Sequence, residues 1–269
     1  MAIQTSHLLL LVSILVAAIA GHLVGRRQRI GIGNILMDML LAAMLVARLA
    51  FVAIWFDQYR NAPWSVLDIR DGGFMPWAGL VAALAVAIWR GSKRPELRRP
   101  LSLGLIAGAL TWTMSLAPDL LGLNGPTTVP SLELKTLAGT GSNLVSISKG
   151  KPMVVNLWAT WCPPCRREMP VLAQAQQRTT EVAFVFVNQG DDEAKVEHYL
   201  MASQLKLDNV LIDTRNELGH AIGSTALPIS LFYDANGNLV DTHVGALSTA
   251  TLAAKLVPFH LHTNKPLDK

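Results

Sequence analysis

The chain has 269 residues, of which 51% are hydrophobic, and its formal net charge is +4. This length suggests about two domains. Residues 1–118 hold 11 basic against 5 acidic residues, whereas residues 119–269 hold 12 against 14, so the positive charge belongs to the first half. Its basic residues separate long apolar runs and form no stripe along a polar face. The composition therefore argues against nucleic acid as a partner.

Four apolar stretches in the first half are long enough to cross about 30 Å of hydrocarbon as helices. They cover residues 7–24, 32–56, 74–89 and 101–117, of which the third is the shortest. The loops at 25–29 and 90–99 are basic, whereas the loop at 57–73 is mixed in charge. Because basic loops stay in the cytoplasm, the N-terminus and everything after the fourth span are predicted to lie outside.

A cleaved signal peptide is the alternative interpretation of the first span. However, no basic residue precedes this span, its apolar core is long and basic residues follow it. We therefore predict that all four stretches remain in a lipid bilayer. In a bacterial cell this topology corresponds to the inner membrane, with the N-terminus and the C-terminal domain in the periplasm, an oxidising compartment.

A linker containing Gly and Pro is predicted at residues 123–130, between a four-helix membrane domain at 1–122 and a second domain at 131–269. In the second domain, strand and helix patterns alternate. The predicted strands are 132–134, 144–147, 153–158, 182–187, 210–212, 229–233 and 239–244, and the predicted helices are 163–178, 191–203 and one from near 248. The Asn-Gly pair at 236–237 predicts a hairpin between the last two strands. Alternating strands and helices followed by a hairpin and a helix predict an α/β fold.

The only two cysteines, Cys162 and Cys165, come shortly after the apolar run 153–158 and open the predicted helix that follows it. Backbone N–H groups and the helix dipole favour a thiolate at the first sulfur, and the second sulfur is placed to resolve a mixed disulfide. A structural zinc site usually needs four Cys or His ligands, and no second ligand pair is visible. The motif therefore predicts a redox-active Cys162–Cys165 disulfide that needs no metal and no organic cofactor.

The residues around the cysteines resemble a known family. The resemblance is carried by VNLWATWCPPCRREMP at 155–170 and by ALPISLF at 226–232. On these motifs, residues 129–257 closely resemble the thioredoxin-like proteins of the membrane-tethered periplasmic reductase group. This group includes the TlpA-like proteins and the thiol-reducing factors of cytochrome c maturation. The resemblance implies a thioredoxin fold and thiol–disulfide exchange with protein substrates.

The resemblance also implies roles for individual residues. Cys162 is expected to be the attacking thiol and Cys165 the resolving thiol, and Glu168 is expected to help move their protons. Pro228 resembles the family's cis-proline, which packs against the disulfide and leaves the backbone of Leu227 free to pair with a substrate strand. The residues expected to contact the substrate are Trp161, Pro163, Pro164 and Leu227.

Two of these roles leave alternatives open. Asn156 stands where thioredoxin itself has a buried aspartate, so Glu168 is the better candidate for proton transfer. A glutamate on the surface of the first helix turns also fits the sequence at this position. Trp158 and Trp161 fit either an apolar surround of the disulfide or plain packing.

The direction of electron flow is predicted from the two residues between the cysteines. Pro163 and Pro164 put no histidine there, which argues against a strong oxidant. We therefore predict a reductase of protein disulfides. Because the spans contain no cysteine, a separate membrane thiol carrier must supply the electrons. The alternatives are an oxidase or isomerase that uses the same cysteines, and a lipid-handling or scaffold protein whose redox domain presents a partner surface.

Residues 31–89 resemble the N-terminal half of prolipoprotein diacylglyceryl transferase, on the stretches MLVARLAF at 44–51 and IRDGGF at 69–74. Trp77 stands where that family has a histidine, and the later arginine-rich motifs are absent, so lipid transfer is not expected. Asp38 and Arg48 are charges inside a predicted span, where ionisable residues are costly. They suggest contact with a lipid headgroup or a partner, or pairing with a neighbouring span.

Overall fold

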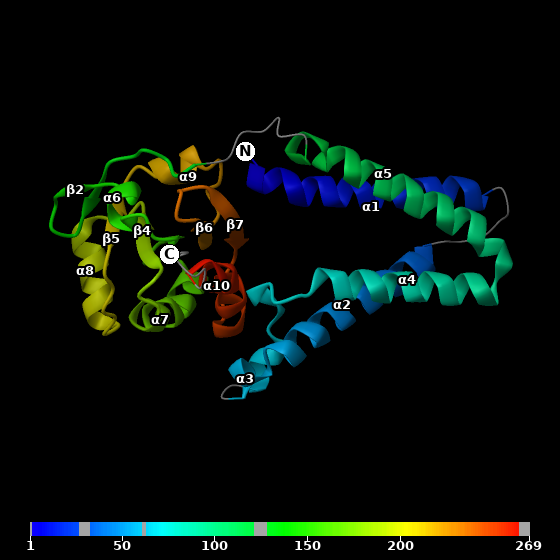
Figure 1. The fold of residues 1–269 in the computed structure, drawn as a ribbon, viewed down its shortest axis with the longest axis horizontal. Coiled ribbons are helices and arrows are strands. Elements are labelled where there is room, and N and C mark those ends of the chain that lie inside the picture. Colours follow the sequence, from blue (N-terminus) through cyan, green and yellow to red (C-terminus); the bar gives the residue numbers. More distant parts are fainter. Residues whose placement is uncertain (1, 27–32, 61–62, 121–127, 264–269) are drawn as a thin grey trace, which may run out of the picture. The chain divides into compact units, whose positions relative to one another are not determined.

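The computed structural model describes residues 2–26, 33–60, 63–120 and 128–263 (Figure 1). Contacts between residues divide the chain into two compact units. The first contains Ala2–Val66 and Gly73–Gly125, and the second contains Leu67–Gly72 and Pro126–Lys269. Among the described residues, the first unit is helical and the second holds the β-sheet.

Four long helices form the described part of the helical unit. They are α1 (Ala2–Arg26), α2 (Gly33–Ile54), α4 (Pro76–Lys93) and α5 (Arg98–Leu120), with shorter turns at α3 (Phe56–Tyr59), η1 (Pro63–Leu67) and η3 (Pro95–Leu97). Helix α1 packs against α5, and α2 packs against α4. A methyl group on Gly104 or Gly108 of α5 would lie 2.8 or 2.9 Å from an atom of Ala17 in α1. Small residues thus allow the close backbone approach that is typical of helix contacts in membranes.

Each of the four predicted spans coincides with a helix over most of its described residues, but these helices differ in length and apolarity. Within the part of the chain that the structure describes, two helical stretches are long and apolar enough to cross a membrane, Gly33–Ile54 and Pro95–Ala117. In α1 the described apolar stretch is shorter and covers Val12–Gly25. The crossing of a membrane by all four helices therefore stays a prediction.

Both charged residues of the second predicted span have partners within the helical unit. Asp38 of α2 pairs with Arg90 of α4, so the expected pairing with a neighbouring helix is confirmed for this carboxylate. The guanidinium of Arg48 donates hydrogen bonds to the backbone carbonyl oxygens of Val66, at 3.1 Å, and Gly73, at 2.8 Å. These bonds fasten the segment after α2 to the helix and place Arg48 in a structural role.

A seven-stranded sheet, in the order β2–β1–β5–β4–β3–β6–β7, forms the centre of the second unit (Figure 1). Strands β3, β4 and β5 are parallel, and β1, β6 and β7 run antiparallel to the strands beside them. The strands are β1 (Leu134–Thr136), β2 (Gly141–Ser142), β3 (Met153–Trp158), β4 (Ala183–Gln189), β5 (Val210–Asp213), β6 (Ile229–Tyr233) and β7 (Leu239–Val244). The helices are η2 (Ile69–Asp71), α6 (Leu144–Ser148), α7 (Pro163–Arg178), α8 (Glu193–Ala202), α9 (Glu217–Ala221) and α10 (Thr249–Thr263).

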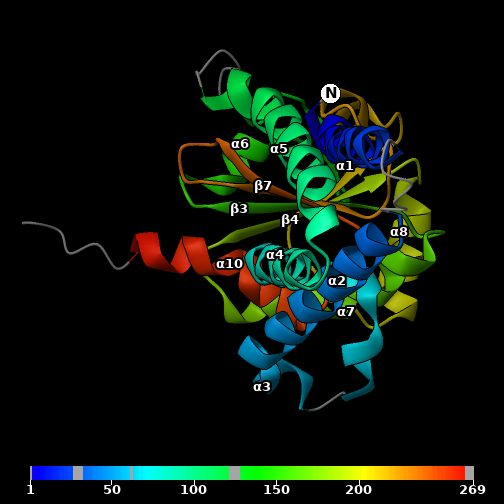
Figure 2. The same cartoon turned by 90° about the vertical axis from the view of Figure 1, so that its right-hand side faces the viewer.

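One buried core joins the sheet to α7, α8 and α10. Val154 and Trp158 of β3 belong to it together with Leu172 of α7, Val196 of α8 and Leu256 of α10. Helix α6 lies on the other side of the sheet from α7 and α10 (Figure 2). Both cysteines are members of this core, so the packing of α7 against the sheet also positions the redox site.

The predicted α/β fold of the second half is confirmed. Strands β3, β6 and β7 and helix α7 have the predicted bounds. Strand β1 begins at Leu134, two residues later than the pattern of 132–134 predicts, and α9 has no counterpart among the predicted helices. Within the predicted linker, Thr128 pairs with Asn238, whereas residues 123–127 lie outside the described part of the chain.

The prediction of a strand at 144–147 is wrong, because this segment forms helix α6. Asn143 caps the helix: its Oδ1 accepts a hydrogen bond from the backbone N–H of Ser146 at 2.8 Å, and the Ser146 hydroxyl accepts one from the N–H of Asn143. Leu144 is buried while the exposed Val145 faces solvent. A capping box at the start of a short apolar run thus decides for helix over strand.

Candidate active site

The two cysteines lie where β3 turns into α7. The chain leaves β3 at Trp158, and the N–H of Cys162 closes a turn on the carbonyl oxygen of Ala159 at 3.2 Å. Cys162 is the N-cap of α7, and its Sγ accepts a hydrogen bond from the N–H of Cys165 at 3.2 Å. Pro163 occupies the first helical position, where the missing N–H costs nothing. The predicted pairing of the cysteines is present as a Cys162–Cys165 disulfide.

The disulfide lies just below the surface. Cys162 is 3% exposed and Cys165 is fully buried, whereas Trp161 beside them is 66% exposed. At the N-terminus of a helix, backbone N–H groups and the helix dipole stabilise a negative charge. The reduced Cys162 is therefore held in an environment that favours the thiolate, which is the reactive form in disulfide exchange.

The peptide bond between Leu227 and Pro228 is cis, as the resemblance implies. Pro228 directly precedes β6, whose first residue, Ile229, pairs with Leu157 near the end of β3. Leu227 packs against the same core that contains the cysteines. The proline and the Cys162 turn are thus brought to the same edge of the sheet by the pairing of β3 with β6.

Glu168 is buried on α7, one turn after Cys165, with 1% of its surface exposed. Its Oε1 accepts a hydrogen bond from Asn156 Nδ2 at 2.8 Å, and its Oε2 accepts one from the N–H of Leu247 at 2.8 Å. Burial raises the pKa of this carboxyl from 4.5 to about 7, although both hydrogen bonds act in the opposite direction. Glu168 is therefore an interior acid that changes protonation near neutral pH, and the alternative of a surface glutamate is wrong.

Asn156 is the partner of Glu168 that the sequence pattern does not assign. It is 1% exposed and also donates a hydrogen bond to the hydroxyl of Ser230 on β6 at 3.0 Å. The alternation of side chains along β3 could have indicated this contact. Asn156 shares a face of the strand with Val154 and Trp158, which belong to the core under α7. Trp158 itself is fully buried and packs against Tyr199, with ring centroids 5.4 Å apart. It belongs to the same buried core as both cysteines.

Within the described residues, no group of three or more His, Cys, Asp or Glu side chains is arranged to hold a metal ion. The site consists of a disulfide at a helix N-terminus, a cis-proline at the same end of the sheet and a buried acid one turn further along α7. On a sheet with parallel β3, β4 and β5 and antiparallel β6 and β7, this arrangement defines a thioredoxin-fold thiol–disulfide exchange protein.

Comparisons with known proteins agree with this class. The Redoxin family matches residues 125–256. The thioredoxin-like protein YneN of Bacillus subtilis is 32% identical over 47% of this chain and 75% of its own. The thiol:disulfide interchange protein DsbE of Escherichia coli is 32% identical over 62% of this chain and 94% of its own. The thiol-disulfide oxidoreductase ResA of Geobacillus thermodenitrificans is 30% identical, with coverages of 52% and 77%.

The chain therefore belongs to the Redoxin family of thioredoxin-like thiol–disulfide oxidoreductases. Among solved structures, that of MTB dsbF is 32% identical over 49% of this chain and 99% of its own, with a TM-score of 0.45. None of these matches supports the resemblance of residues 31–89 to the diacylglyceryl transferase, which stays a prediction.

The raised pKa of Glu168 predicts how the stability of the oxidised protein depends on pH. The folded state holds the Glu168 proton up to about pH 7, whereas the unfolded state holds it only up to about pH 4.5. Protonated Glu168 therefore contributes to the free energy of unfolding in full below pH 4.5, and this contribution is lost as the pH rises through 7. The loss amounts to roughly 3 kcal/mol. Glu168→Gln is expected to abolish this decrease of stability with pH. The decrease is measured by urea unfolding of the oxidised chain between pH 4.5 and pH 8.

The exposed Glu181 provides a matched control. Glu181→Gln is expected to keep the wild-type dependence of stability on pH. A Glu168→Gln variant with an unchanged slope between pH 4.5 and pH 8 would contradict the assignment of the raised pKa to Glu168.

Proposed function

We propose that this chain is a membrane-anchored thiol–disulfide oxidoreductase that reduces disulfides in protein substrates. The observation that carries the proposal is the position of Cys162 at the N-cap of α7, with its sulfur in contact with the N–H of Cys165. Trp161 beside Cys162 is exposed, and the cis-Pro228 lies at the same end of the sheet. We expect Trp161 to offer an apolar surface to a substrate, and the backbone of Leu227 to pair with a substrate strand.

The reaction has two exchange steps that balance in atoms and electrons. The Cys162 thiolate attacks one sulfur of the substrate disulfide, forms a mixed disulfide and releases the other substrate sulfur as a thiolate, which takes up a proton. Cys165 then loses its proton and attacks Cys162, which releases the second substrate thiol. Two electrons pass to the substrate, and Cys162–Cys165 is left oxidised, which is the form that the structure contains.

Glu168 is the candidate acceptor for the proton that Cys165 loses. Cys165 is fully buried, so its proton has no direct path to water. The pKa of Glu168, raised by burial to about 7, allows the carboxyl to take up and release a proton at neutral pH. Glu168 follows Cys165 by three positions on α7, which places both side chains on one side of the helix.

Reduction is favoured over oxidation by the residues between the cysteines. Strong oxidants of this kind stabilise their reduced form by lowering the thiol pKa by several units. Pro163 and Pro164 bring neither a charge nor a hydrogen-bond donor to the sulfur at this position. A protein that reduces its substrates needs re-reduction, and we assign that step to a separate membrane thiol carrier.

The apolar helices α2 and α5 support membrane anchoring. The basic residues at 90–99 favour the cytoplasmic side for the loop between α4 and α5. The second unit, which contains the disulfide and is called the redox unit below, would then lie in the periplasm, with the helices in the bacterial inner membrane. The matched relatives include thiol:disulfide interchange proteins, in keeping with protein thiols and disulfides as substrates.

Substitution of each cysteine is expected to stop the reaction at a different step. Cys162→Ser should reduce turnover of a protein disulfide to the uncatalysed rate, because no attacking thiolate remains. Cys165→Ser should accumulate a mixed disulfide that survives in non-reducing gel electrophoresis. A Cys162→Ser variant that keeps its cellular function would favour a scaffold instead. As the folding control, the thermal stability of each variant is compared with that of the reduced wild type.

The redox potential of the full-length chain, equilibrated against glutathione or dithiothreitol buffers in detergent, tests the direction of electron flow. A reductase is expected to have a value near that of thioredoxin, about −270 mV. A value near about −120 mV, typical of a strong periplasmic oxidant, would overturn the assignment as a reductase.

The topology is tested by labelling single cysteines in a chain that lacks Cys162 and Cys165. Lys206→Cys, on the redox unit, is expected to react with a membrane-impermeant maleimide in spheroplasts. Lys93→Cys, at the end of α4, is expected to react only after lysis. Labelling of Lys93→Cys in intact spheroplasts would contradict the proposed orientation.

A further inference from the structure

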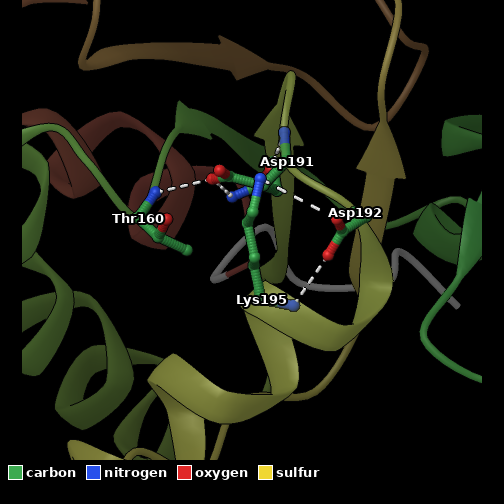
Figure 3. Close-up of polar contacts among 5 residues, drawn as sticks. Thr160, Asp191, Asp192 and Lys195 are labelled. Atoms are coloured by element: carbon green, nitrogen blue, oxygen red, sulfur yellow. Dashed lines mark hydrogen bonds and ion pairs between the residues drawn. The ribbon is translucent and has the colours of Figure 1, made fainter.

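Asp191 has a buried carboxylate close to the redox site, with 3% of its surface exposed. The sequence pattern places it in a helix at 191–203, but the helix is capped by Asp192, whose Oδ1 accepts a hydrogen bond from the N–H of Lys195 at 2.9 Å. Asp191 takes no part in this cap and points instead to Thr160 (Figure 3). Its burial therefore needs a different explanation from helix capping.

The carboxylate of Asp191 bridges two neighbouring strand ends. Its Oδ2 accepts hydrogen bonds from the backbone N–H of Thr160, at 2.9 Å, and from Asn188 Nδ2, at 3.1 Å. Asn188 Oδ1 in turn accepts a hydrogen bond from the N–H of Asp191 at 3.2 Å. Asn188 lies on β4 opposite Trp158, the last residue of β3. The carboxylate is thus fixed from β4 and reaches the chain as it leaves β3.

Thr160 lies inside the turn that carries the attacking cysteine. This turn is closed by the hydrogen bond from the Cys162 N–H to Ala159, and its Trp161 is exposed. In the oxidised protein, the disulfide fastens the turn covalently to Cys165 in α7. Reduction breaks that covalent bond, whereas the hydrogen bond from Thr160 to Asp191 involves no reacting atom.

We propose that Asp191 is a positioning residue that holds the turn through Thr160, so that Cys162 stays at the N-terminus of α7 once the disulfide is reduced. This inference rests on the proposed exchange function. The bond stabilises the reduced state more than the oxidised state, where the disulfide already fixes the turn. It therefore favours the reduced protein at equilibrium and keeps the thiolate ready for attack.

Two substitutions separate the hydrogen bond from the charge. Asp191→Ala removes the acceptor, whereas Asp191→Asn retains it, because both side-chain bonds end on the same oxygen. With insulin as the disulfide substrate and the full-length chain in detergent, we expect Asp191→Ala to lower kcat/KM roughly tenfold. The equilibrium constant with glutathione should shift roughly tenfold toward the disulfide, which makes the potential about 30 mV more negative. Asp191→Asn should stay close to wild type in both.

Asp192→Ala is the matched control. It removes a carboxylate from the adjacent position and takes away the cap of α8, but it leaves the bond between Thr160 and Asp191 in place. It is expected to lower the thermal stability while kcat/KM and the redox potential remain at wild-type values. A purely structural role for Asp191 would give the same pattern for Asp191→Ala.

Hydrogen–deuterium exchange at the Thr160 amide of the reduced wild-type chain tests the hydrogen bond to Asp191 without any substitution. If Asp191→Ala does not fold, this measurement alone decides whether the proposal holds. Continued protection after reduction is expected, and exchange at the rate of an open loop would overturn the proposal. Wild-type values for Asp191→Ala would also overturn it, as would an equal loss in Asp191→Asn, which would assign the effect to charge. A wild-type chain that reduces no disulfide would instead contradict the proposed function.

Discussion

The redox site depends on the register of β3 between β4 and β6. Because β3 is parallel to β4 and antiparallel to β6, the ends of β3 and β4 and the start of β6 meet at one edge of the sheet. The Cys162 turn, the loop after β4 and the cis-proline converge there although they are far apart in the sequence. A shift of β3 by one residue would turn its side chains to the opposite face and separate Asn156 from Glu168.

The buried acid adds a second constraint, because it depends on the packing of three elements. Glu168 projects from α7 and is held by Asn156 of the sheet and by the N–H of Leu247, just before α10. An apolar surround disfavours its charged form, whereas the two donors favour it. The balance leaves the pKa near neutrality, where a carboxyl group can exchange protons with a thiol. Its chemistry therefore follows from the assembly of the core.

Local patterns were sufficient for the parts of the fold that are encoded in contiguous residues. The apolar run of β3 and the Cys-x-x-Cys motif predict their structures directly, whereas the cis bond at Pro228 was implied by the family resemblance. The run at 144–147 is different, because four residues do not distinguish a helix from a strand and the Asn143 cap decides. The partners of Asn156 and Asp191 could not be predicted from the sequence. Those of Asp191 depend on the register of β3 with β4, and that of Asn156 on α7 depends on how this helix packs on the sheet.

The glycines of the helical unit have a consequence for how its sequence can change over time. An exposed apolar residue of these helices, such as Leu41 or Leu110, can be exchanged among Leu, Ile, Val and Phe at little cost, because one apolar side chain replaces another. Gly79 of α4 differs, because a methyl group there would lie 2.9 Å from the carbonyl oxygen of Ala43 in α2. The same holds for Gly104 and Gly108 of α5 against α1. Related chains should thus drift freely along most of these helices while the glycines persist, so their spacing would still identify this half after overall similarity has faded.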